Sequence, residues 1–248
     1  MKHKQKYTMN DLLEIMHILA AKDGCPWDSV QTHSSLRKYL IEESYEVAEA
    51  IDENNSENLK EELGDVLFQV IFHSEIASKE GNFDFSEVVD GLSRKMIYRH
   101  PHIFGNEDDK NLQLRWDELK RQEKGYHTLS EDIAKVPKAF PSLMKAQKIS
   151  NKVLKKKLSD ISDEDKKKEK ENTIFNELIA EINAEISSLK DIREEDENKK
   201  MEKIGKILIK ITDISFFLQI NADFSLTNTL ETFINNIKGN ESEAQMLE

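Results

Sequence analysis

Apolar residues recur at helical spacing in nearly every ordered stretch of this chain, whereas the strict alternation of a β-strand is hard to find. In the first such stretch, leucine, isoleucine and methionine form a stripe that ends before Gly24, and Asn10 or Asp11 is its expected cap. Three more helices are expected over residues 34–52, 59–79 and 86–100. The last should be capped by Ser86 and should bury Val88, Val89, Leu92 and Met96. The sequence therefore predicts an all-α fold.

The rest of the chain is also predicted to be helical, but it is interrupted. Residues 111–125 form an expected fifth helix that carries Trp116 and Lys120. Residues 155–171 are mostly lysine, aspartate and glutamate, a composition typical of a solvated linker or a weakly ordered helix. We therefore expect a first domain in residues 1–125, a connector and charged linker in 126–172, and a second domain in 173–248.

Two short acidic clusters lie on the second and third predicted helices. In the first cluster, Glu43 and Glu46 are three residues apart and Glu42 and Glu46 are four apart, so their carboxylates lie along one helical face. Glu62 and Asp65 repeat the three-residue spacing. Like charges at this spacing destabilise a helix by roughly 0.2–0.5 kcal/mol per pair, so a neutralising partner is expected. Carboxylate oxygens suit hard cations such as Mg²⁺ or Mn²⁺.

The alternative to a metal site is an ordinary solvated acidic face, which is common on surface helices. The second cluster argues against that alternative, because residues 66–72 follow it with a run so apolar that most faces of the helix must be buried. A di-iron helical bundle would need Glu-x-x-His pairs on its helices, and only a lone pair, Glu14 and His17, occurs on another helix.

Charge and composition limit the classes of partner. The chain has 48 acidic and 36 basic residues and a formal net charge of −12, which disfavours polymeric nucleic acid and anionic membrane surfaces. It has no apolar run long enough to span a membrane and no N-terminal signal sequence, so a cytoplasmic location is expected. Its single cysteine, Cys25, excludes an internal disulfide. Small anions remain possible ligands, because a bound divalent metal can reverse the local potential.

The second half of the chain resembles a worn copy of the first. Residues from Phe175 align with those from Leu40, and residues from Met201 align with those from Lys60. On this alignment Glu46 matches Glu181, but Glu43, Glu62 and Asp65 meet Leu178, Lys203 and Lys206. Ammonium groups in place of ligands oppose cation binding, so the second half is expected to be a structural or dimerisation domain. An anion site at the two lysines is the alternative.

The acidic motifs EExxE and ExxD, together with several other strings, resemble the MazG family of all-α nucleoside triphosphate pyrophosphohydrolases. The further matching strings are GCPWD with Gln31 and Thr32, EELGD, RHPHIFG from Arg99, RWDELK from Arg115 and LMKAQKIS from Leu143. They follow one another in the family's order over roughly residues 8–150. The resemblance implies tandem four-helix units in a dimeric helical bundle, with the second unit degenerate.

The resemblance also implies an activity: Mg²⁺-dependent hydrolysis of NTPs or dNTPs to the monophosphate and pyrophosphate by a homodimer, with Mn²⁺ as an alternative metal. Carried over by position, the implied metal ligands are Glu43, Glu46, Glu62 and Asp65. Glu42 would be an outer ligand or the base that orients water, so the implied catalytic residues are Glu42, Glu43 and Glu46. The implied nucleotide-binding residues are Lys95, Arg99, Trp116 and Lys120.

Several of these residues also have a structural explanation. Lys95 and Arg99 lie one helical turn apart and could simply complement a helix dipole before Pro101. Trp116 could be a core or interface residue. The alternative function is a nucleotide-sensing or partner-binding protein that keeps the fold and binds metal-nucleotide without turnover.

Overall fold

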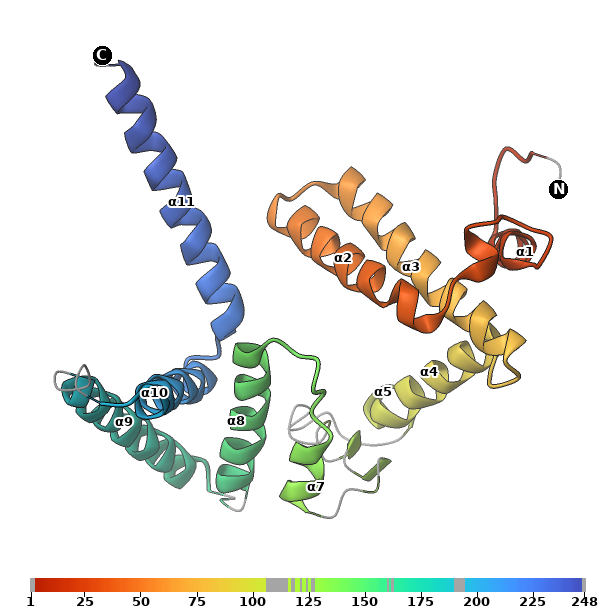
Figure 1. Ribbon diagram of the computed structural model, residues 1–248. Coiled ribbons are helices and arrows are strands. Elements are labelled where there is room, and N and C mark those ends of the chain that lie inside the picture. Colours follow the sequence, from red (N-terminus) through yellow and green to blue (C-terminus); the bar gives the residue numbers. More distant parts are fainter. Residues whose placement is uncertain are drawn as a thin grey trace. The chain divides into compact units, whose positions relative to one another are not determined.

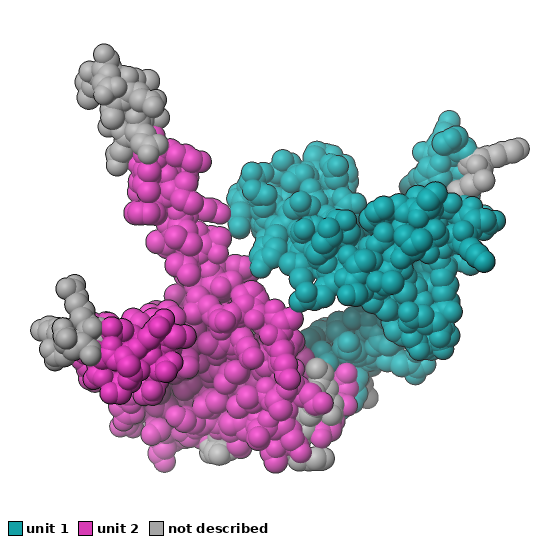
Figure 2. Space-filling view, in the orientation of Figure 1, with its two compact units in different colours: residues 1–116 teal, residues 117–248 magenta. Residues whose placement is uncertain are grey.

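The computed structural model describes residues 3–105, 116, 119–120, 122–123, 125, 128–159, 161, 163–189 and 195–246. The regular structure in these residues is helical, and none of them lies in a strand, which confirms the predicted all-α fold. The chain divides into two compact units, residues 1–116 and 117–248, which Figure 2 colours separately. Most of the predicted fifth helix, residues 111–125, lies outside the described residues.

The first unit is built around a long antiparallel helical hairpin (Figure 1). Its arms are α2 (His33–Asp52) and α3 (Ser56–Lys79), which are joined by a tight turn in which Asn54 has a φ of 54°. Helices α1 (Met9–Ala20) and α4 (Phe85–Arg99) both contact α3. A short 3-10 turn, η1 (Asp28–Val30), precedes α2, and α5 (Pro101–Phe104) follows α4.

Two of the predicted helix caps are wrong, and the hydrogen bonds show why. Helix α1 is capped by Thr8, whose hydroxyl accepts from the Asp11 backbone N–H while the Asp11 carboxylate accepts from the Thr8 N–H. Helix α4 is capped by Asp84, which accepts from the Glu87 N–H. Ser86 lies inside α4 and donates its hydroxyl hydrogen to Asp84. In both cases an earlier residue that can form a reciprocal capping box is preferred.

The core of the first unit lies between the hairpin and α1. Its buried side chains are those of Met16, Ala20, Leu36, Ile71, Phe72 and Ile76. Helix α4 does not bury the face that the sequence predicted, because Val89 and Leu92 are 45% and 53% exposed. The reason is geometric: among the described helices of this unit, α4 meets α3 and the short α5, and no other described helix covers its outer face.

The second unit has a separate core. It comprises α7 (Leu129–Ala134), α8 (Ser142–Ser159), α9 (Glu164–Ser188), α10 (Glu197–Phe217) and α11 (Ala222–Met246). Helix α10 packs on both α8 and α9, around Leu154, Leu158, Ile174 and Leu178. Thus α8, which lies within the stretch expected to be a connector, supplies two residues of this core. The division into 1–125, 126–172 and 173–248 stays a prediction.

A buried glutamine fixes the start of α11. Gln147 on α8 is 8% exposed; its amide nitrogen donates to the Ile220 carbonyl (2.7 Å), and its amide oxygen accepts from the Ala222 N–H (2.9 Å). Gln147→Met should lower the free energy of unfolding of the second unit by about 1–3 kcal/mol, because both backbone groups lose their partner. Urea unfolding followed by circular dichroism measures this loss. An equal loss in Glu177→Gln, on the exposed surface of α9, would contradict it.

Candidate metal and nucleotide site

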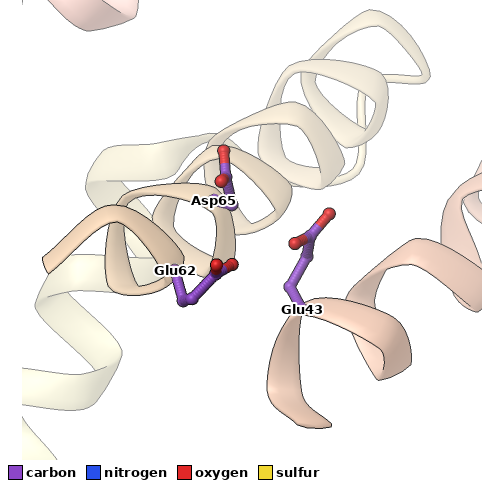
Figure 3. A group of neighbouring side chains, drawn as sticks. All are labelled: Glu43, Glu62 and Asp65. Carbon is purple, nitrogen blue, oxygen red and sulfur yellow. The ribbon is translucent and has the colours of Figure 1, made fainter. Parts of the chain in front are cut away.

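The hairpin brings three of the predicted ligands together. Glu43 lies near the middle of α2, and Glu62 and Asp65 lie one turn apart on the facing part of α3. One carboxylate oxygen from each residue lies within 4.8 Å of the other two. Figure 3 shows the carboxyl group of Glu43 reaching from its helix toward the helix that carries Glu62 and Asp65. The antiparallel pairing of α2 and α3 therefore creates the acidic cluster from two separate sequence motifs.

The electrostatics of the acidic cluster are unfavourable in the absence of a cation. Burial raises the pKa of Glu43 to about 7, and hydrogen bonding to Glu46 together with the charges of Glu46, Asp65 and Glu62 adds to the shift. Burial also raises the pKa of Glu62, again assisted by the charges of Glu46 and Asp65. Glu46, which is exposed and lies outside the three-residue group, is thus an electrostatic neighbour of both.

The donor set suits a hard divalent cation. Among the residues that the structure describes, no lysine or arginine forms an ion pair with Glu43, Glu46, Glu62 or Asp65. Carboxylates gathered without a counterion are the oxygen ligands that Mg²⁺ and Mn²⁺ prefer. Glu42 is exposed on the same helix and is not part of the three-residue group. The residues present therefore fit a divalent metal.

The predicted nucleotide-binding residues lie partly together. Lys95 and Arg99 are one turn apart on α4; Lys95 is half-buried and has no ion pair among the described residues, whereas Arg99 is 7% exposed. The Arg99 guanidinium lies 5.6 Å from the centre of the Trp116 ring, which also meets His100 edge-on at 4.8 Å. Lys120 is half-buried in the unit that begins at residue 117.

Among the described residues of the second unit, the acidic set is not repeated. Lys206 pairs with Glu202 one turn away (2.6 Å), and the Lys203 ammonium donates to the Ser188 carbonyl (3.3 Å). Glu181, the counterpart of Glu46, forms an ion pair across to Lys210 on α10. Both lysines at ligand positions thus have local partners, so nothing in these contacts favours an anion site there. The ammonium group of Lys210 thus neutralises Glu181, the acidic position that survives in the second unit.

Two features of the hairpin escaped the sequence reasoning. Gln69 is buried on α3 one turn beyond Asp65. His33 and His73 face each other through their Nδ1 atoms, 2.7 Å apart, across the hairpin. A single polar residue within the apolar run 66–72 was the available signal for Gln69. No spacing rule links His33 with His73, because they are 40 residues apart and meet only through the hairpin.

Comparison with known proteins agrees with this geometry. Residues 31–104, which contain the whole acidic cluster, match the family model described as the MazG nucleotide pyrophosphohydrolase domain. A Thermotoga maritima protein named nucleoside triphosphate pyrophosphohydrolase/pyrophosphatase MazG is 36% identical over 92% of this chain and 83% of its own length. The chain belongs to the MazG family. This confirms the resemblance inferred from the motifs.

Other relatives divide according to how much of this MazG-family chain they match. The Escherichia coli nucleoside triphosphate pyrophosphohydrolase is 31% identical over 90% of this chain and 82% of its own. The Mycolicibacterium smegmatis protein of the same name is 43% identical, but over 52% of this chain and 41% of its own. The alignments with the Thermotoga maritima and Escherichia coli proteins extend into the second unit, so both units of this chain have counterparts in those relatives.

Proposed function

We propose that this chain hydrolyses nucleoside triphosphates to nucleoside monophosphates and pyrophosphate at a Mg²⁺-dependent site in its first unit. The observation that carries the proposal is the convergence of Glu43, Glu62 and Asp65 within 4.8 Å, inside the segment that matches the MazG domain. Relatives aligned over nine-tenths of the chain carry the same activity in their names. Ribose and deoxyribose triphosphates are both proposed substrates.

In this proposal Glu43, Glu46, Glu62 and Asp65 would hold the metal. When bound, Mg²⁺ (or Mn²⁺) would supply positive charge that neutralises phosphate oxygens and polarises the reacting phosphorus. Because the pKa of Glu43 is raised to about 7, this carboxyl would give up a proton on becoming a ligand near neutral pH. Glu42, exposed on the solvent side of α2, would orient the attacking water as an outer ligand or general base.

The cationic and aromatic residues would hold the rest of the nucleotide. Lys95, half-buried and free of ion pairs among the described residues, is the proposed phosphate contact on α4. Arg99 and Trp116 already contact each other and would act together, the first on phosphate and the second on the base. Lys120 is proposed as a triphosphate contact because it matches a family position within the motif that begins at Arg115.

A homodimer is part of the proposal, and exposed apolar side chains of the first unit support it. Ile41, Tyr45, Leu63, Val89 and Leu92 are each more than two-fifths exposed on α2, α3 and α4. A second copy that covered these faces would bury Val89 and Leu92, which the sequence predicted to be inside. Sedimentation equilibrium measures the assembly state, and a monomer at micromolar concentration would contradict the dimer.

Pyrophosphate release from the common ribo- and deoxyribonucleoside triphosphates tests the proposed activity. Purified full-length protein should release pyrophosphate with Mg²⁺ present and should stop when the metal is chelated. Phosphate release without pyrophosphate would indicate a different bond specificity. A protein that binds Mg²⁺ and nucleotide with no turnover of any substrate would be a sensor instead.

Removal of a lysine from the second unit should leave the reaction almost unchanged. Lys203→Ala deletes a side chain that contacts the Ser188 carbonyl and none of the acidic cluster, so kcat/KM is expected to stay within about twofold of the parent. Steady-state pyrophosphate release measures it. A folded, correctly assembled Lys203→Ala variant with no activity would overturn the assignment of the reaction to the first unit.

A further inference from the structure

The side chain of Gln69 is buried without a hydrogen-bond partner for its oxygen. The residue is 3% exposed, and its Oε1 atom accepts no hydrogen bond from any residue that the structure describes. Leaving such a buried acceptor unpaired costs roughly 1–3 kcal/mol, and nearly all buried polar groups in native proteins are bonded to protein or to ordered water. A donor that is not part of the chain is therefore expected beside Gln69.

The same chain shows how it satisfies a glutamine whose role is structural. Gln147, buried to a similar degree in the second unit, has both ends of its amide bonded to backbone groups. Gln69 lies in a helix interior where the backbone hydrogen bonds are already formed within α3, so no backbone group is available to it. Gln69 and Gln147 are therefore similarly buried, but only Gln147 has backbone partners for its side-chain amide.

Helical geometry directs Gln69 toward the acidic cluster. It lies four residues after Asp65 and seven after Glu62, which places all three on one face of α3. Side chains of a helix lean toward its N-terminus, and the N-terminal neighbour of Gln69 on this face is Asp65. Beyond Gln69 the hairpin holds the buried apolar side chains of Leu36 and Phe72 and the stacked pair His33 and His73, and none of these donates a hydrogen bond to the Gln69 Oε1 atom.

The second unit shows that a side chain at this position can reach the cluster. In the alignment of the two halves Gln69 matches Lys210 and Glu46 matches Glu181, and these two counterparts form an ion pair between α10 and α9. Lysine is longer than glutamine, so its ammonium group spans the space directly. A shorter glutamine at the same position leaves room for a small polar group between its amide and the carboxylates.

We infer that Gln69 is a further positioning residue of the site: its Oε1 accepts a hydrogen bond from a water molecule that completes the coordination shell of the ion held by the acidic cluster. This inference rests on the proposed metal site. A water there has donors and acceptors on both sides, with the amide on one and Asp65 and Glu43 on the other. Such outer-shell partners typically change metal affinity or activity by about 10- to 100-fold when removed.

The test compares Gln69→Met with Gln147→Met in the full-length protein. Both tryptophans, Trp27 and Trp116, lie in the first unit, so tryptophan fluorescence follows the thermal unfolding of the unit that holds the site. Gln69→Met should unfold without metal at the same temperature as the parent or higher, because an unpaired amide has been removed. The Mg²⁺ concentration that gives half of the metal-induced rise in Tm should increase about 10- to 100-fold. Gln147→Met should leave that concentration unchanged.

A lysine at the same position provides an independent variant. Gln69→Lys copies the arrangement of the second unit, so its ammonium group should pair with Glu46, raise the metal-free Tm and abolish the response to Mg²⁺. A Mg²⁺ response of Gln69→Lys equal to that of the parent would show that this side chain does not reach the acidic cluster.

The possible outcomes separate this inference from the proposed function. If the parent responds to Mg²⁺ in its Tm but releases no pyrophosphate, the proposed reaction is wrong and the role of Gln69 is still decided by the Tm titrations. If Gln69→Met fails to fold, or needs no more Mg²⁺ than the parent, the inference is overturned and the reaction is untouched. A parent whose Tm does not respond to Mg²⁺ would overturn both.

Discussion

Replacement of Glu43 by glutamine is expected to reduce Mg²⁺-dependent pyrophosphate release by at least about a hundredfold while the first unit stays folded. The amide has the shape of the carboxyl group but cannot carry the negative charge that a cation needs from its ligand. Because Glu43 is the only member of the three-residue group that comes from α2, its loss leaves that group with Glu62 and Asp65 of α3. Steady-state kinetics at saturating nucleotide over a range of Mg²⁺ concentrations measures the effect.

Glu49→Gln is the matched control, since it removes the same charge from an exposed position on the same helix. It should retain nearly full activity. A Glu43→Gln variant with more than a tenth of the parent's activity, or a Glu49→Gln variant that is equally impaired, would show that the three-residue group is not the centre of the reaction.

The stability of the metal-free protein should depend on pH through Glu43. Its pKa is raised in the folded state to about 7, from 4.5, so the protonated carboxyl stabilises the fold below pH 4.5 and this contribution is lost as pH rises through about 7. Glu43→Gln is neutral at every pH. Its metal-free Tm should therefore exceed that of the parent by several degrees at pH 8 and by little at pH 5.

Comparison with the variant is necessary because other groups titrate in the same range. Burial and the neighbouring His33 lower the pKa of His73, so this residue favours the folded state at high pH and opposes it as pH falls through the unfolded value of 6.5. The contribution of His73 is common to both proteins and cancels in the difference between their Tm values. Saturating Mg²⁺ should then reverse the order at pH 8, stabilising the parent but not the variant.

The helices and the acidic cluster were predictable because both follow from local spacing. Apolar periodicity located α2 and α3 within a few residues of their observed bounds. The three-residue spacing of Glu62 and Asp65 placed both on one face, and the short turn between the helices made an antiparallel hairpin the simple arrangement. Only the facing of Glu43 toward that pair required the tertiary structure.

Features that depend on contacts between helices were not predictable in this way. Val89 and Leu92 follow a buried pattern, yet they are exposed, and none of the described helices of the first unit covers them. Thr8 and Asp84 displaced the predicted caps because each can exchange two hydrogen bonds with the residue three positions later. In the sequence Gln69 is one polar residue in an apolar run. Its significance depends on the missing hydrogen-bond donor for its side-chain oxygen, which only the three-dimensional structure reveals.

The ion pair between Lys210 and Glu181 means that the second half of the chain neutralises its surviving acidic position with a side chain of its own. An ammonium group attached to the backbone is a counterion that cannot dissociate, whatever the concentration of free metal. In the proposed function, by contrast, the first unit takes its counterion from solution. Depletion of Mg²⁺ should therefore lower the stability of the first unit and leave that of the second unit unchanged. The second unit then serves, within the same chain, as an internal reference for the response of the first unit to metal.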